Sequence, residues 1–271
     1  MVCLLKMKFI IRSFVFLRAA CFATLLLTAT PLFAAGGAKS QALESDQPGH
    51  LNYLAAGTPA AAALLPPPPL SGSSEQAADM DEVRAVYHAA SDVDKKAAHA
   101  EKRFSIFNFT GSVGSFFVET KLPKTAAFFE MVQKDAESVC NAGKEYFQRP
   151  RPYTIDPALA NGKLETSFSY PSGHSTESMT IALVLAELMP EKRETIMAHA
   201  RLIGWHRVQI ARHYPTDIYA GRVLAQAIVG EMKKNADFQK DMAAVKDEIA
   251  TLAHVPAVHY KSRQLVEQAA K

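Results

Sequence analysis

The chain has 271 residues, of which 48% are hydrophobic and 21% charged, and its formal net charge is +3 with a sequence pI near 8.6. Residues 1–35 contain four of the 30 basic side chains and none of the 27 acidic ones. Without that segment the chain carries 26 basic and 27 acidic side chains. This near-neutral balance argues against a surface that binds nucleic acid or an anionic membrane.

The N-terminal segment has the three parts of a secretory signal peptide. Its basic residues lie within the first 18 positions, an apolar run covers 19–33, and the small residues Ala34 and Ala35 follow. That order is typical of a cleaved signal, and the run is too short to predict a membrane span. Met7 offers a second start for the same signal. We expect cleavage near Ala34 or Ala35 and a periplasmic or secreted product.

The rest of the sequence divides into three parts. Residues 36–72 are rich in Ala and Pro, and four successive prolines at 66–69 favour an extended polyproline II arm. A helical pattern fills 73–252, and a polar tail at 253–271 ends the chain. The two N-terminal cysteines leave with the signal, so the remaining Cys140 has no partner for an internal disulfide.

Apolar residues recur at three- and four-residue steps through most of this region, as they do in helices. Capping residues and prolines mark several of the expected helix starts. The period-two alternation of strands is almost absent. The helical patterns cover residues 73–97, 123–148, 173–189, 191–212, 215–233 and 236–252. The sequence therefore predicts an all-α, single-domain bundle of about seven to nine helices.

Two short segments place cations and a histidine at expected helix ends. Lys144 is in the last turn of one long helix, and Arg151 follows between two prolines that restrict its backbone. The segment PSGH then opens the next long helix: Ser172 can cap it, Gly173 allows a ligand close to the backbone, and His174 stands beside N–H groups that favour an anion. Each segment also has a structural explanation, because cations often complement a helix C-terminus and capped helices often carry an incidental histidine.

A third segment combines Arg207 with a histidine and a carboxylate. Asp217 follows His213 by four residues, and Pro215 between them is expected to begin a helix with Asp217 in its first turn. A carboxylate at this spacing can reach the imidazole, fix its tautomer and leave the other ring nitrogen nucleophilic. The spacing alone is common and is more often structural.

Together the three segments supply what a phosphoryl group requires: fixed cations, a helix N-terminus, and two histidines for attack and proton transfer. A metal site on His206, His213 and Asp217 is disfavoured, because the chain has neither an HExxH motif nor a cysteine cluster and nearby cations would repel a metal. A GxxxxGK[ST] phosphate loop is also missing. We therefore expect no metal and no cofactor.

The order Lys-x6-Arg-Pro, Pro-Ser-Gly-His and Arg-x5-His-x3-Asp resembles the signature of the type 2 phosphatidic acid phosphatase superfamily. The LLPPPP segment at 64–69, the signal and the lack of long apolar runs are similar to its soluble branch, the class A bacterial non-specific acid phosphatases. The resemblance covers about 51–230. It implies an all-α fold and metal-independent hydrolysis of small phosphomonoesters through a phosphohistidine, with no nucleic-acid partner; it leaves open whether copies of the chain form a homo-oligomer.

The resemblance also implies roles for individual residues. His213 corresponds to the nucleophile, Asp217 to its orienting partner, and His174 to the general acid that later activates water. The phosphate-binding positions are Lys144, Arg151, Ser172, Gly173 and Arg207.

One position departs from the family pattern, and several other functions stay open. His206 stands where the family has Ser, and in an unbroken helix over 191–212 it would share a face with His213; it is then either a packed helix histidine or a pocket-edge group. The alternative functions are a vanadium-dependent haloperoxidase, a lipid-phosphate phosphatase, and a non-catalytic periplasmic module that binds anions or a partner protein.

Overall fold

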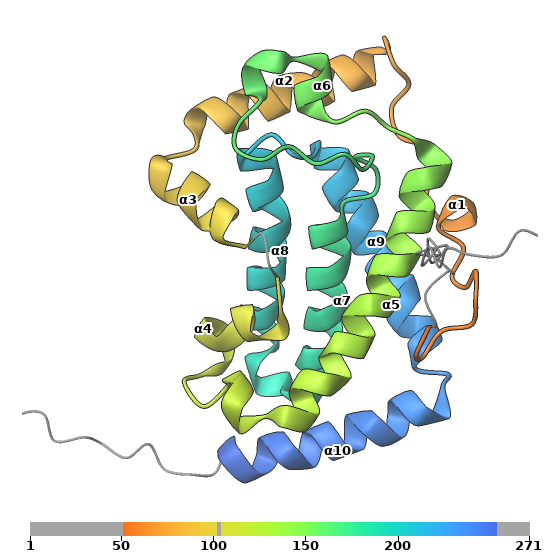
Figure 1. Cartoon of the computed structure of the whole chain (residues 1–271), viewed down its shortest axis with the longest axis vertical. Helices are drawn as coiled ribbons and strands as arrows, with labels where there is room; N and C mark the ends of the chain where they lie inside the picture. The colour runs from red at the N-terminus through yellow and green to blue at the C-terminus, as the bar shows by residue number, and fades with distance from the viewer. Residues whose placement is uncertain (1–50, 102–103, 254–271) are drawn as a thin grey trace, which may run out of the picture. The chain divides into compact units, whose positions relative to one another are not determined.

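The structure is a computed structural model that describes residues 51–101 and 104–253. The expected signal peptide, the first part of the arm and the C-terminal tail after residue 253 lie outside these ranges. All regular elements in the described part are helices, which confirms the all-α prediction (Figure 1). The α-helices are α1 (Ala61–Leu64), α2 (Ser74–Ala89), α3 (Asp92–Ala100), α4 (Thr110–Val113), α5 (Pro123–Phe147), α6 (Pro152–Ile155), α7 (Gly173–Leu188), α8 (Arg193–Gln209), α9 (Pro215–Met232) and α10 (Ala236–Ala253). Short 3-10 helices cover Ile106–Phe109, Glu119–Lys121, Pro157–Leu159 and Pro190–Lys192.

The ends of several helices follow directly from local sequence. The Ser73 side chain accepts a hydrogen bond from the backbone of Gln76 and so caps α2, while Ser91 forms a capping box that begins α3. Pro123 opens α5 and Pro215 opens α9, each at the first helical position. α5 ends at Phe147, and the next residue, Gln148, caps it in the left-handed conformation.

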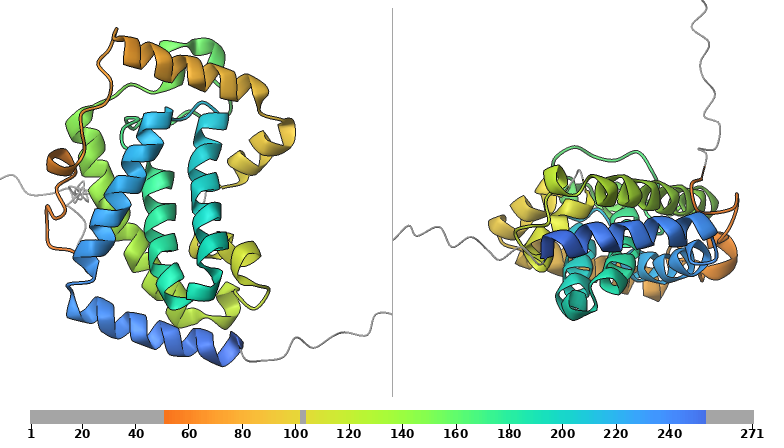
Figure 2. Two further views of the ribbon diagram at one scale, coloured as in Figure 1. Left: turned by 180° about the vertical axis from the view of Figure 1, so that it is seen from behind. Right: turned by 90° about the horizontal axis from the view of Figure 1, so that it is seen from below.

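The core is built around α7, which packs against α8, α9 and α5. α7 is buried along most of its length, as expected of a helix surrounded by others, and fully buried residues such as Ile181 and Leu185 fill its second half. Figure 2 shows α7, α8 and α9 side by side, with α10 crossing one end of the bundle. The aromatic residue Phe238 and the apolar Val245 and Ile249 connect α10 to the same core.

Two segments differ from the sequence prediction. The pattern at 73–97 is not one helix, because the chain turns between α2 and α3 at the Ser91 cap. The expected helix at 191–212 is shorter, since α8 begins at Arg193 and ends at Gln209, and Ala211 has a left-handed φ of 51°. His206 and His213 therefore do not share a helical face, and the interpretation that placed them on one face is wrong.

The described part of the Pro-rich arm is partly a core element. Tyr53, Leu54, Ala61 and Leu65 are buried, and the single-turn helix α1 packs on α5. The arm is therefore not extended throughout residues 51–72. Across the helices that the structure describes, none is both long enough and apolar enough to span a membrane.

Candidate active site

The three sequence segments meet at one end of the bundle. α5 and α8 end there and α7 and α9 begin there, while α2 and α6 lie across the same end (Figure 1). The starts of α7 and α9 are close together: the backbone N–H of Ser172 donates to the carbonyl of Asp217. Gly221 allows this approach, because a Cβ there would lie 2.9 Å from the Ser172 carbonyl oxygen. Four helix ends thus position the predicted residues around one point.

His213 lies buried at this point, between a carboxylate and a cation. Its Nδ1 is 3.3 Å from Asp217 Oδ2, and its Nε2 is 3.2 Å from a guanidinium nitrogen of Arg151. Because the guanidinium can only donate, Nε2 must be the acceptor and Nδ1 carries the proton that faces Asp217. Burial, together with the charges of Arg151 and Lys144, holds the pKa of His213 well below its usual value. The imidazole is therefore neutral, and the Nε2 electron pair accepts the hydrogen bond from Arg151.

Asp217 is fixed by several donors, and the sequence indicated only one of them. As predicted, it lies in the first turn of α9, where it is fully buried. One oxygen accepts from the Ser169 hydroxyl at 2.6 Å and the Tyr214 backbone at 2.9 Å, and the other accepts from Arg149 at 2.6 Å. Burial raises the pKa of the Asp217 carboxyl, and the Arg149 guanidinium opposes this effect.

Arg149 is a central residue that the sequence analysis did not identify. Its guanidinium bridges Asp217 and Asp79, each at 2.6 Å, and also donates to Gln76 at 2.7 Å. It stacks over the Tyr214 ring, 3.8 Å from the ring centre. In the sequence, Arg149 stands directly before a proline at the end of α5. That position predicts the end of a helix, but it does not indicate the contacts with Asp79 and Asp217.

The three cations predicted to bind phosphate, Lys144, Arg151 and Arg207, are all buried at this end of the bundle, and we call them the clamp. Lys144 donates to the Phe168 carbonyl at 2.8 Å, and Arg151 pairs with Glu165 at 2.5 Å and donates to the Ser167 carbonyl at 2.7 Å. Burial lowers the pKa of Lys144. These contacts set both side chains in place before any anion arrives.

The charge of Arg207 is only weakly compensated. It donates to the Ala98 carbonyl, and its distance to the nearest oxygen of Glu101 is 3.5 Å. Its Nε is buried without a hydrogen-bond partner among the described residues. Burial lowers the pKa of Arg207 to about 10. An anion that bound here would satisfy both the charge and the free N–H.

The predicted PSGH residues form the start of α7. The Ser172 side chain accepts from the Ser175 backbone at 3.4 Å, so it caps the helix, and Gly173 is the first helical residue. His174 Nε2 is 3.2 Å from the Glu101 carbonyl oxygen. Burial and the charge of Arg207 lower the pKa of His174 to about 3. His174 is therefore neutral while the site holds no anion.

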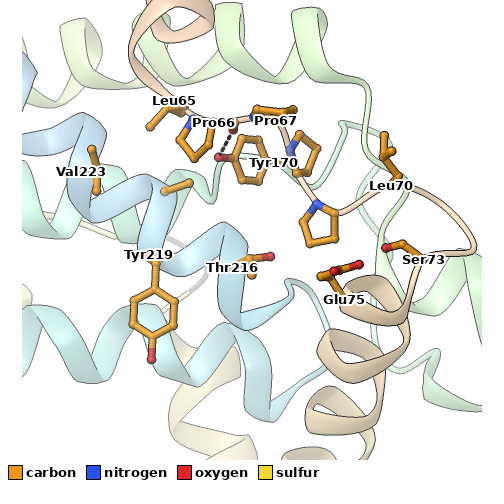
Figure 3. A pocket seen from close by; sticks show the side chains of 13 residues that line it. Leu65, Pro66, Pro67, Leu70, Ser73, Glu75, Tyr170, Thr216, Tyr219 and Val223 are labelled. Carbon is orange, nitrogen blue, oxygen red and sulfur yellow. Dashed lines mark hydrogen bonds between the residues drawn. The ribbon is translucent and has the colours of Figure 1, made fainter.

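A cavity of about 620 Å³ adjoins the clamp. Its lining residues are His99, Lys163, Leu164, Glu165, Thr166, Ser167, Arg207, Ile210 and Arg212. A second cavity of about 600 Å³ lies between the proline arm and α9, where the Tyr170 hydroxyl donates to the Pro66 carbonyl at 2.7 Å (Figure 3). None of the predicted site residues lines this second cavity. No group of three or more His, Cys, Asp or Glu side chains within 51–101 and 104–253 is arranged to hold a metal ion.

Residues 128–238 match the PAP2 superfamily, and this range includes every predicted site residue from Lys144 to Asp217. This part of the chain is therefore similar to the PAP2 superfamily. Several acid phosphatases are similar to this chain. The chain is 31% identical over 170 residues to the non-specific acid phosphatase of Providencia stuartii, covering 60% of this chain and 66% of that protein.

Two further relatives extend the comparison. The acid phosphatase of Zymomonas mobilis is 29% identical over 144 residues, which are 50% of this chain and 54% of that protein. The lipid A 1-phosphatase of Rhizobium etli is 42% identical over 84 residues, which are 31% of this chain and 35% of that protein. The chain thus spans about half to two thirds of the length of the acid phosphatases it matches. The expected resemblance to non-specific acid phosphatases is confirmed.

Proposed function

We propose that the protein is an acid phosphatase that hydrolyses small phosphomonoesters through a phosphohistidine on His213, without a metal ion. The observation that carries this proposal is the neutral, buried His213, whose Nδ1 faces Asp217 and whose Nε2 faces the Arg151 guanidinium. A nucleophile with this geometry and a low pKa stays unprotonated in acid. The PAP2 superfamily match and the acid phosphatase relatives support the same reaction class.

In the first step, the substrate phosphate binds among Lys144, Arg151 and Arg207. The Nε2 electron pair of His213 attacks phosphorus, a P–N bond forms, and the bond from phosphorus to the ester oxygen breaks. His174 gives its proton to that departing oxygen, so an alcohol leaves. The cations offset the negative charge that spreads over the phosphoryl oxygens during this transfer.

The low pKa of His174 is compatible with this role because substrate changes its surroundings. Without an anion, burial and then the charges of Arg207 and the other cations hold the pKa of His174 low. A bound phosphate monoester brings negative charge beside the imidazole, which favours the protonated form. His174 is then charged in the complex and neutral in the free enzyme, as a general acid that later acts as a base requires.

In the second step, water replaces the alcohol. His174, now neutral, accepts a proton from the water while the water oxygen attacks phosphorus and the P–N bond breaks. Inorganic phosphate leaves, and His213 returns to its neutral form with Asp217 holding the same tautomer. The 620 Å³ cavity beside Arg207 and Ser167 gives the leaving alcohol room and has a mixed polar and apolar lining, which suits a broad range of small esters.

The cellular location is a separate proposal that rests on the sequence. The basic start, apolar run and small residues of 1–35 predict export to the periplasm or beyond. An N-terminal sequence determined on the protein recovered from the periplasmic fraction tests this; a start near Ala34 or Ala35 is expected. An uncleaved chain that stays in the cytoplasm would contradict it.

The activity is tested with p-nitrophenyl phosphate between pH 4 and 8, with and without a metal chelator. We expect turnover that the chelator does not change and that is highest in acid. His213→Ala should reduce turnover by at least a thousandfold, whereas His88→Ala, which changes an exposed histidine on α2, should leave it unchanged. Full activity of His213→Ala, or activity lost to the chelator, would contradict the proposal.

A further inference from the structure

His206, where the family pattern has Ser, makes a buried contact with a carboxylate. Its Nδ1 is 2.8 Å from Glu101 Oε1, and both side chains are almost completely enclosed. The partners come from different helices, since His206 lies on α8 and Glu101 follows the end of α3. The contact is close enough for a charge-assisted hydrogen bond, so His206 has a specific partner beyond general packing.

Glu101 in turn contacts two of the predicted site residues. Its other oxygen is 3.5 Å from Arg207, and its backbone carbonyl is 3.2 Å from His174 Nε2. The carboxylate thus lies closer to His206 than to Arg207 by 0.7 Å. The carboxylate is shared between a histidine and an arginine, and the histidine has the shorter contact.

The weak contact matters because Arg207 is where an anion is expected to bind. A guanidinium that forms two short parallel bonds to a carboxylate is already neutralised and has few donors left. Arg207 instead donates to the neutral Ala98 carbonyl, keeps a buried Nε without a partner among the described residues, and has only a long contact to the Glu101 carboxylate. Its charge and at least one donor therefore remain open to a phosphate.

We propose that His206 is a positioning residue: it holds the Glu101 carboxylate away from Arg207 and so keeps that guanidinium open for the substrate phosphate. This inference rests on the proposed phosphatase function. Without the imidazole donor, the carboxylate would turn to its remaining cation and form a closer pair with Arg207. Phosphate would then have to compete with an internal anion, and its affinity would fall, while the groups that carry out the chemical steps would stay in place.

The first test measures inorganic phosphate binding through the fluorescence of Trp205, which adjoins His206 and is the single tryptophan of the chain. His206→Leu keeps the volume and removes the donor, and we expect its affinity for phosphate to fall about tenfold. His206→Asn keeps a donor near the position of Nδ1 and should bind within about threefold of the wild type. Unchanged affinity in His206→Leu would overturn the inference.

The second test removes the competing anion. Glu101→Gln should bind phosphate at least as tightly as the wild type, and the double variant His206→Leu/Glu101→Gln should recover most of the affinity lost by His206→Leu. A double variant that binds phosphate as weakly as His206→Leu would overturn the inference. Weaker phosphate binding by Glu101→Gln alone would also overturn it, and this result can be obtained even if His206→Leu does not fold.

Steady-state kinetics separate this role from a general loss of structure. With p-nitrophenyl phosphate, His206→Leu should raise KM by about tenfold and change kcat by less than threefold. A large fall in kcat, together with a loss of thermal stability, would contradict a positioning role. If the wild type binds phosphate but has no turnover, the proposed function fails and the binding tests still decide the role of His206.

Discussion

A continuous line of buried polar contacts runs from Asp79 through Arg149 and Asp217 to the neutral His213. Each carboxylate in the line is 2.6 Å from the same guanidinium. The cation opposes the rise in the pKa of Asp217 that burial causes and so favours its ionised form, which in turn favours the His213 tautomer with the proton on Nδ1. Arg149 therefore supports the predicted nucleophile His213 indirectly, through its contact with Asp217.

Arg149→Met should both destabilise the protein and lower its activity. The substitution keeps an unbranched stem but removes the guanidinium, so that two buried carboxylates lose their cation, which costs about 3–5 kcal/mol. Urea unfolding followed by circular dichroism measures the free energy of unfolding. Arg84→Met is the matched control, because Arg84 pairs with Asp81 and Asp156 at the surface and contributes little. Equal stabilities of the two variants would contradict the buried-charge account.

Individual site residues could be predicted from the sequence only where a short motif or a local spacing indicated them. The four-residue step from His213 to Asp217 predicted their contact, and the motif order predicted the cations. Asp79 and Glu101 were not predicted, because they reach the site from α2 and from the end of α3, some 70 and 105 residues before their partners. Contacts between residues so far apart in the sequence leave no recognisable local pattern.

At the scale of elements, the close approach of α7 and α9 places Ser172 beside the start of α9. Gly221→Ala adds a methyl group 2.9 Å from the Ser172 carbonyl oxygen and from the Ser175 Cβ, so the two helices must separate. We expect a loss of about 1–3 kcal/mol in stability and a fall in kcat/KM.

Gly230→Ala on the same helix is the control for this prediction. Nothing lies within 4 Å of a Cβ at that position, so the alanine should stabilise α9 by up to about 1 kcal/mol. Thermal unfolding and p-nitrophenyl phosphate turnover measure both variants. Similar effects of the two substitutions would show that helix propensity, and not the contact with α7, determines the result.

Helix boundaries were predictable where the chain itself marks them. Pro123 and Pro215 set two starts, and Gln148 ends α5 just before the Arg-Pro pair. The end of α8 was not predictable, because Ala211 adopts a left-handed φ while the N–H groups of Arg212 and His213 donate back to the Arg207 carbonyl. This turn is fixed by tertiary contacts that aim His213 at the clamp, and nothing in the local sequence requires it.

For the whole molecule, the net charge is a poor guide to function, whereas the burial of charge is informative. Lys144, Arg151 and Arg207 are each at most 4% exposed and act on the same two histidines. Because His174 and His213 stay neutral among cations in the folded state, the unfolded chain binds more protons than the folded chain in acid. The free energy of unfolding therefore falls as the pH is lowered. The site and the pH dependence of folding are therefore linked.

This link gives a prediction for the pH dependence of stability. The pKa of His174 is about 3 in the folded state and near 6.5 when unfolded, so its contribution to stability is complete above pH 6.5 and is lost as the pH falls toward 3. Replacing His174 with Gln removes this loss. In buffer without phosphate, lowering the pH from 6.5 to 5 should destabilise the wild type by about 2 kcal/mol more than His174→Gln.

Urea unfolding at both pH values measures this difference. Saturating phosphate should reduce it, because the bound anion favours protonated His174 in the folded state. Parallel pH dependences of the wild type and His174→Gln would contradict the account.

The central claim is a covalent phosphoryl group on Nε2 of His213. It is tested most directly with His174→Ala and p-nitrophenyl phosphate, whose good leaving group needs no proton, while loss of the base slows hydrolysis of the intermediate. The reaction is quenched in alkaline denaturant, because a P–N bond breaks in acid, and the peptides are analysed by mass spectrometry. We predict a phosphoryl group on the peptide that contains His213, and none after His213→Ala. Turnover with no phosphorylated peptide, or a phosphoryl group on another residue, would contradict the mechanism.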